Sequence, residues 1–156
     1  MSIPQSGGGP IEDFAQLAEL LASGCKPKAD WRIGTEHEKF GWLTDSRKPL
    51  PYAGERSIKA LFDGLTERHG WEPMVEGDNV IGLKRNGATV SLEPGGQFEL
   101  SGAAVENLNE TAAELQTHLD EVRGIADPLG IRFMGIGAAP EWTHDQMPVM
   151  PKGRYR

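Results

Sequence analysis

Residues 79–101 read NVIGLKRNGATVSLEPGGQFELS, and this stretch decides which kind of fold the chain can adopt. Two extended segments, 79–84 and 88–93, flank the Asn86-Gly87 pair. Asn-Gly between such segments is the strongest short signal for a hairpin, because both central residues of a type I′ turn need a positive φ. A Pro-Gly-Gly bend then leads into a third extended segment, 97–101. The stretch therefore predicts neighbouring antiparallel strands.

Helical patterns and further strands surround this sheet-forming stretch. The clearest helix covers 105–126, where apolar residues recur at alternating steps of three and four. A coiled coil is the alternative interpretation, but Asp127-Pro128 breaks the pattern after barely three heptads. Apolar spacing and turn residues predict further helices at 11–23 and 55–69 and further strands at 31–43, 71–75 and 131–136.

The order of these elements is not a regular alternation of strand and helix. It indicates an α+β fold, in which helices pack on one face of an antiparallel sheet. The other face is then free to carry a site. By composition, we divide the chain into a flexible glycine-rich lead at 1–10, a sheet-and-helix region at 11–139, and a proline-rich segment at 140–156 that ends in a Lys-Gly-Arg-Tyr motif.

Composition narrows the possible functions. The 156 residues are enough for one domain, and 16 basic against 23 acidic residues give a net charge of −7. An acidic chain is a poor binder of nucleic-acid backbones or anionic membranes, and no apolar run is long enough to span a bilayer. We therefore expect no nucleic-acid or membrane partner. The single cysteine, Cys25, excludes an intrachain disulfide and a multi-cysteine zinc site, which favours a cytoplasmic location.

Two pairs of glutamates are candidates for chemistry. Glu36 and Glu38 lie two residues apart in a predicted strand, so they share one face of the sheet. Adjacent carboxylates repel each other unless water or a cation separates them, so the alternatives are a solvated strand face and a divalent-cation site. Glu93 and Glu99 lie on either side of the Pro-Gly-Gly bend, and Gln97 shares a strand face with Glu99.

These acids favour the cation site, because Glu99 is flanked by apolar residues on a strand that must also contribute to the core. Four carboxylates without a histidine or cysteine cluster suit Mg²⁺ or Mn²⁺ better than zinc. Such ions commonly hold phosphates, which makes nucleotide-dependent phosphoryl or acyl-phosphate chemistry the leading class. Gly95 and Gly96 would let a ligand approach the backbone closely. The histidines His69, His118 and His144 are scattered along the sequence and are expected to be surface or cap residues.

Four motifs carry a resemblance to a known family. They are Trp31–Gly41 (WRIGTEHEKFG), Glu76–Lys84 (EGDNVIGLK), Ser91–Gly102 (SLEPGGQFELSG) and Met150–Tyr155 (MPKGRY). In this order, over about 31–155, the chain resembles the glutamate–cysteine ligases of the plant and proteobacterial type. The resemblance implies the curved antiparallel sheet of the glutamine-synthetase-like carboxylate–amine ligases.

The resemblance also implies an activity and its residues. ATP would phosphorylate the γ-carboxylate of L-glutamate, and the amine of L-cysteine would displace phosphate, in the first step of glutathione synthesis. By motif position, the Mg²⁺ (or Mn²⁺) ligands would be Glu36, Glu38, Glu93 and Glu99, and the substrate-binding residues would be Gly95, Gly96, Gln97 and Arg154. Arg154 would hold a substrate carboxylate, since a guanidinium matches that geometry.

The chain differs from the family in its length. The chain stops at Arg156, just after the last motif, whereas members of the family are much longer. We therefore expect a truncated protein with an incomplete sheet and no ligase activity on its own. The alternatives are a γ-glutamyl ligase with another amine acceptor and a non-catalytic module that binds a metal or a nucleotide.

Overall fold

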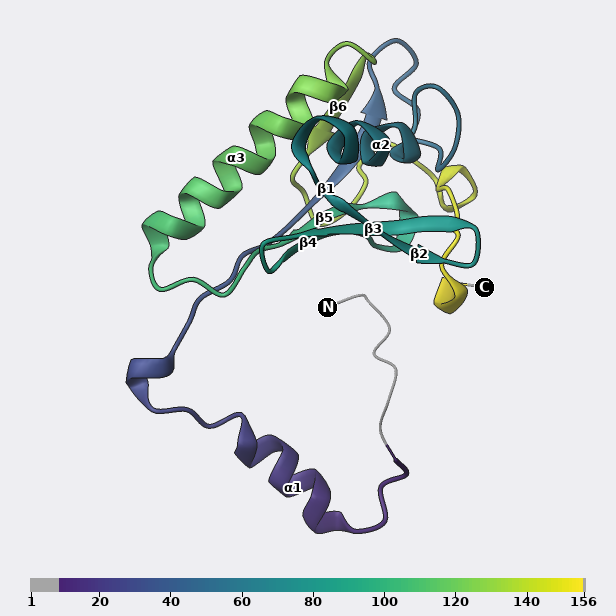
Figure 1. The fold of residues 1–156 in the computed structure, drawn as a ribbon. Coiled ribbons are helices and arrows are strands. Elements are labelled where there is room, and N and C mark those ends of the chain that lie inside the picture. The colour runs from purple at the N-terminus through teal and green to yellow at the C-terminus, as the bar shows by residue number, and fades with distance from the viewer. Residues whose placement is uncertain (1–8, 156) are drawn as a thin grey trace.

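The computed structural model describes residues 9–155, so most of the predicted lead at 1–10 lies outside the described residues. Within them, six strands form an antiparallel sheet in the order β2-β3-β4-β5-β1-β6 (Figure 1). The strands are β1 (Glu36–Leu43), β2 (Glu72–Glu76), β3 (Asn79–Arg85), β4 (Ala88–Leu92), β5 (Phe98–Ser101) and β6 (Ile131–Met134). The helices are α1 (Phe14–Ser23), α2 (Ile58–His69) and α3 (Leu108–Ala126).

The predicted hairpin and bend form the centre of this sheet. Asn86 and Gly87 have φ angles of 51° and 86°, which confirms the turn between β3 and β4. After β4, the backbone N–H of Glu93 donates to the carbonyl of Gln97 at 2.9 Å, and this closes the bend. Both bend glycines have a positive φ, which few other residues adopt without strain.

Helices α2 and α3 cover one face of the sheet, as Figure 1 shows, so the prediction of an α+β fold with helices on one face is confirmed. The core lies between these helices and the sheet. Its buried apolar residues include Leu61, Phe62, Leu65, Leu83, Val90, Leu92, Phe98, Leu100, Val122, Ile125 and Ile131. Burial of this face supplies most of the driving force for folding.

Several predicted boundaries were wrong by a few residues, and the structure shows why. Val105 pairs with Ile33 in an isolated β-bridge, so α3 begins only after the cap residue Asn107, and the strand predicted from 31 begins at Glu36. The side chain of Asp13 caps α1, which therefore begins at Phe14 and not at 11. Side-chain caps therefore mark the starts of α1 and α3 more sharply than apolar spacing does.

Helix α1 lies apart from the sheet and its two covering helices (Figure 1). None of its residues is buried, and Phe14 and Leu21 are 82% and 79% exposed. In the part of the chain from residue 9 to 155, no helix combines the length and the apolar character that a membrane span needs.

Candidate functional site

The pairing of β1 with β5 brings two of the predicted acids to neighbouring positions. Glu38 lies directly opposite Glu99, and Glu36 lies opposite Ser101. Because side chains alternate along a strand, all three glutamates project from the face that the helices leave open. His37 and Lys39, in contrast, project toward the helices; the amine of Lys39 contacts His118 of α3.

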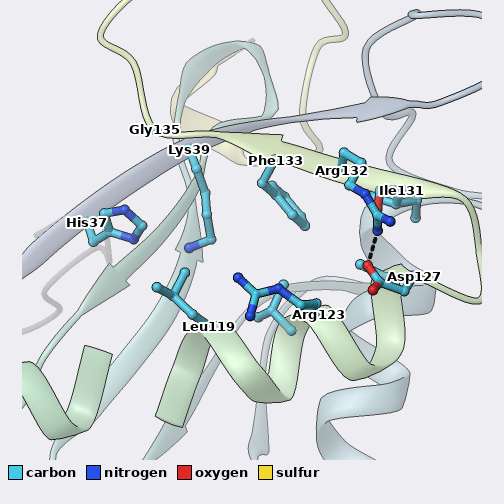
Figure 2. A pocket seen from close by; sticks show the side chains of 11 residues that line it. His37, Lys39, Leu119, Arg123, Asp127, Ile131, Arg132, Phe133 and Gly135 are labelled. Atoms are coloured by element: carbon cyan, nitrogen blue, oxygen red, sulfur yellow. Dashed lines mark hydrogen bonds and ion pairs between the residues drawn. The ribbon is translucent and has the colours of Figure 1, made fainter. Parts of the chain in front are cut away.

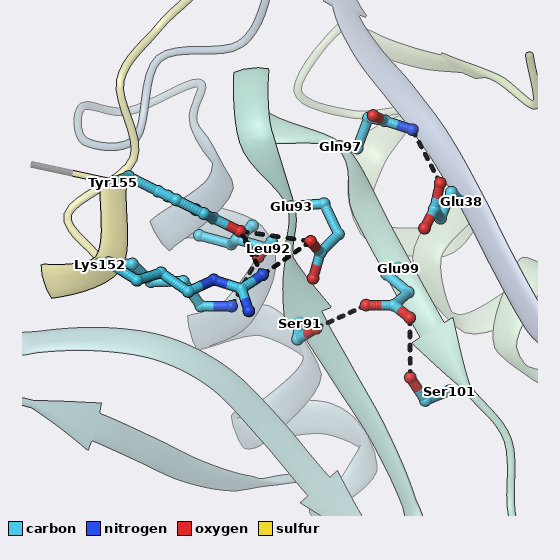
Figure 3. Close-up of polar contacts among 10 residues, drawn as sticks. Glu38, Ser91, Leu92, Glu93, Gln97, Glu99, Ser101, Lys152 and Tyr155 are labelled. Carbon is cyan, nitrogen blue, oxygen red and sulfur yellow. Dashed lines mark hydrogen bonds and ion pairs between the residues drawn. The ribbon is translucent and has the colours of Figure 1, made fainter. Parts of the chain in front are cut away.

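Glu99 is held by hydroxyl groups from two strands (Figure 3). Ser91 of β4 donates to Oε2 at 2.9 Å, and Ser101 of β5 donates to Oε1 at 3.0 Å. The residue is only 2% exposed. Both carboxylate oxygens are therefore fixed in direction by neutral donors.

Gln97 links the two acid-bearing strands. Its side-chain amide donates to Oε2 of Glu38 at 3.1 Å, between the end of the bend and β1 (Figure 3).

The two bend glycines, Gly95 and Gly96, pack against the proline-rich segment. A Cβ at Gly95 would clash with Met147, and one at Gly96 would lie 3.2 Å from the Met150 methyl group. This bend borders a cavity of about 440 Å³, lined by Pro94, Gly95, His144, Met147, Pro148, Val149, Met150 and Tyr155.

Glu93 lies at the end of β4, where the C-terminal motif folds back onto it. Arg154 forms a 2.9 Å ion pair with Oε2 of Glu93, and the Tyr155 hydroxyl lies 3.3 Å from the same oxygen. The other oxygen, Oε1, is buried and has no hydrogen-bond partner within residues 9–155. Lys152 is also buried, its amine donates to the carbonyl of Leu92 at 2.6 Å, and burial lowers the pKa of that amine.

The structure thus brings the predicted residues together in two groups. Glu36, Glu38, Gln97 and Glu99 form one group on the open sheet face, and Glu93 forms the other with Arg154 beside the Gly95-Gly96 bend. No three or more histidine, cysteine, aspartate or glutamate side chains within the described part of the chain are arranged to enclose a metal ion. The acids share a face but do not close into a cage.

Sequence reasoning missed the two serines and the tyrosine of this site. Strand alternation places Ser101 on the same face as Glu99, so the position of Ser101 could have been predicted from the sequence. Ser91 and Tyr155 were not, because only the β4–β5 register and the folding back of the C-terminal motif bring them to the acids.

The prediction of a surface position for His118 was wrong. The residue is 1% exposed, because its ring stacks on that of Phe98 at 6.2 Å and contacts the amine of Lys39. Its Nε2 lies 2.8 Å from the amine of Lys39, which is also buried and lies 3.4 Å from the carbonyl of Phe98. Burial lowers the pKa of Lys39 to about 7, and burial together with the charge of Lys39 lowers the pKa of His118 to about 2.

Comparison with known proteins identifies the relatives of this chain. A family model described as glutamate-cysteine ligase family 2 (GCS2) matches residues 32–156. The chloroplastic glutamate–cysteine ligase A of Oryza sativa subsp. japonica is 45% identical over 99% of this chain and 35% of its own length. The chloroplastic enzymes of Medicago truncatula and Arabidopsis thaliana are 52% and 51% identical over 89% of this chain, and 27% and 26% of their own lengths.

The same comparison corrects the expected location. These relatives are named as chloroplastic proteins, so the prediction of a cytoplasmic protein was wrong. The reason is that cysteine usage reports redox conditions, which more than one compartment can share. The chain spans only about a quarter to a third of the length of these relatives. Since the family match covers most of its residues, the chain belongs to glutamate-cysteine ligase family 2.

Proposed function

We propose that the chain supplies the carboxylate-bearing sheet of an ATP-dependent ligase that joins the γ-carboxylate of L-glutamate to the amine of L-cysteine. Family membership and the names of the relatives support this proposal. The observation that carries it is the placement of Glu38 directly opposite Glu99 on the open face. Like charges in directly opposite positions destabilise a sheet, so such a pair is expected where a cation is to be bound.

The donor set of this face fits a divalent cation. Glu36, Glu38, Glu93 and Glu99 would hold Mg²⁺ or Mn²⁺, which prefer carboxylate oxygens. The buried Oε1 of Glu93, without a hydrogen-bond partner among the described residues, is the kind of atom that such an ion would satisfy. A bound divalent ion would neutralise charge on the phosphates of ATP during transfer.

The other residues of the site would orient these ligands and the substrates. Ser91 and Ser101 hold both oxygens of Glu99, and Gln97 holds one oxygen of Glu38. Gly95 and Gly96 lie beside the acids, but Met147 and Met150 cover the positions of their missing side chains. A substrate would therefore contact this backbone only after the proline-rich segment had moved. Arg154 would exchange its ion pair with Glu93 for the carboxylate of a substrate once a metal binds Glu93.

Removing either central acid is expected to weaken metal binding. In a Mn²⁺ titration followed by electron paramagnetic resonance, Glu99→Gln and Glu93→Gln should each raise the dissociation constant at least about tenfold, because outer-shell changes alone often cost that much. Glu67→Gln is the matched control, since Glu67 is exposed on α2, away from the open face. Unchanged affinity in both site variants would contradict the ligand assignment.

The ligation itself is testable in a chimera. This chain would replace the matching segment of the Arabidopsis thaliana ligase, to which it is 51% identical, and formation of γ-glutamylcysteine from ATP, glutamate and cysteine would be measured. The chimera should be active, and Glu99→Gln within it should lower kcat by roughly 100-fold or more, as loss of a charge-stabilising group does. A folded chimera without product, or a fully active Glu99→Gln chimera, would refute the proposal.

A further inference from the structure

A second cavity lies on the helix-covered side of the sheet, opposite the carboxylate face. It encloses about 450 Å³ between α3 and strands β1 and β6. Its basic lining residues are His37, Lys39, Arg123 and Arg132. Its apolar lining includes Leu119, Val122 and Phe133, and its one carboxylate, Asp127, is bonded to Arg132. The cavity therefore combines an apolar wall with more basic than acidic side chains, in a chain whose net charge is −7.

Two of these cations converge on the same space. In Figure 2, the side chain of Lys39 comes from β1 and that of Arg123 from α3, and both extend into the gap between the sheet and the helix. Like charges from two separate elements repel each other when they face a common cavity. An anion bound between Lys39 and Arg123 would attract both side chains and offset their mutual repulsion.

The surroundings of Lys39 support the same conclusion. The residue is 2% exposed, and its amine contacts two neutral groups, the Phe98 carbonyl and His118 Nε2. A buried amine keeps its proton most readily beside an anion, because charge is costly to remove from water. The partner of Arg123 within the described residues is Asp120, one helical turn earlier at 3.3 Å, and both side chains are mostly solvent-exposed.

We propose that this cavity binds a small organic oxyanion, a carboxylate or a phosphate monoester. Its charged group would lie between Lys39 and Arg123, and its apolar part would contact Leu119, Val122 and Phe133. Arginine keeps its charge at all relevant pH values and matches carboxylate and phosphate geometry. The volume lies within the range of about 300–1,000 Å³ that is usual for small-molecule sites. The site is separate from the metal face, so this proposal does not depend on the ligase activity.

Three ligands of similar shape test the proposal on the 156-residue chain. Benzoate, phenyl phosphate and uncharged benzamide would be titrated separately, with chemical shifts of backbone amides in α3 and β6 as the readout. At least one anion should bind saturably and shift these amides, and benzamide should not. Tighter binding of benzoate would identify a carboxylate site, and tighter binding of phenyl phosphate a phosphate site. Equal binding of benzamide, or binding of neither anion, would overturn the proposal.

A variant that removes the charge of Arg123 tests where the anion binds. Arg123→Gln should weaken binding about tenfold, as expected for loss of a charge-assisted hydrogen bond. Arg123 is 62% exposed in its side chain, so the substitution leaves the core intact. Arg68→Gln, an exposed change of the same kind on α2, should leave the affinity unchanged. Equal affinities in wild type and Arg123→Gln, or equal losses in both variants, would overturn the site.

Discussion

Acidification from pH 7 to about pH 4 is expected to destabilise the fold by on the order of 3 kcal/mol through His118 alone. Burial and the neighbouring charge of Lys39 hold the pKa of His118 at about 2 in the folded protein, against 6.5 for an ordinary histidine. His37 and Arg85 also face this imidazole and lower its pKa further. In the unfolded chain, His118 therefore binds a proton near pH 6.5, whereas in the folded protein it is protonated only near pH 2.

The sign of the effect follows from this difference. Where the unfolded state binds more protons, stability falls as the pH falls, so the contribution of His118 is complete above pH 6.5 and is lost progressively below it. Urea unfolding at a series of pH values measures this slope. His118→Gln keeps an acceptor for Lys39 but does not titrate, so its stability should depend less steeply on pH.

The control separates this histidine from the carboxylates, which also contribute to acid unfolding. His144→Gln removes an exposed histidine and should leave the wild-type slope unchanged. An identical slope in wild type and in His118→Gln would show that His118 is not kept neutral by the fold.

Truncation of Phe98 is expected to have the largest effect on stability at neutral pH. Phe98 is fully buried, and its ring lies 5.5 Å from that of Phe62, 5.6 Å from that of Phe133 and 6.2 Å from that of His118. It therefore joins α2, α3 and β6 at the centre of the sheet. Phe98→Ala should lower the free energy of unfolding by about 3–5 kcal/mol, the usual cost of a large cavity.

Phe98 also lies between Gln97 and Glu99 in the chain, so it belongs to the strand segment that carries both site residues. Urea unfolding measures the loss, and Leu108→Ala is the control. Leu108 is 70% exposed at the start of α3, so its truncation should cost little. A loss in Phe98→Ala below about 1 kcal/mol, as for an ordinary surface change, would mean that the ring does not organise the core.

The elements of the fold were largely predictable because their signals are local. The Asn86-Gly87 turn and the Pro-Gly-Gly bend each depend on residues a few positions apart, and both formed as expected. Helix α3 also formed, but Leu108 of its predicted apolar stripe is 70% exposed, and Thr111 and His118 are buried instead. The boundaries were less predictable. Because Ile33 and Val105 form a β-bridge, the strand and the helix next to them are shorter than predicted. No local sequence pattern predicts a pairing between residues so far apart in the chain.

The candidate site likewise has features that the sequence predicts and features that depend on the tertiary structure. Strand alternation in the sequence determined that Glu36 and Glu38 share a face and that Glu99 shares one with Gln97, since side chains repeat every two residues. Only the tertiary structure decided that Glu38 lies opposite Glu99, that Arg154 reaches Glu93 from 61 residues away, and that His118 is buried against Lys39 from 79 residues away. Those contacts depend on strand register and on how α3 packs on the sheet, which are set by burial of the whole core and not by any local run of residues.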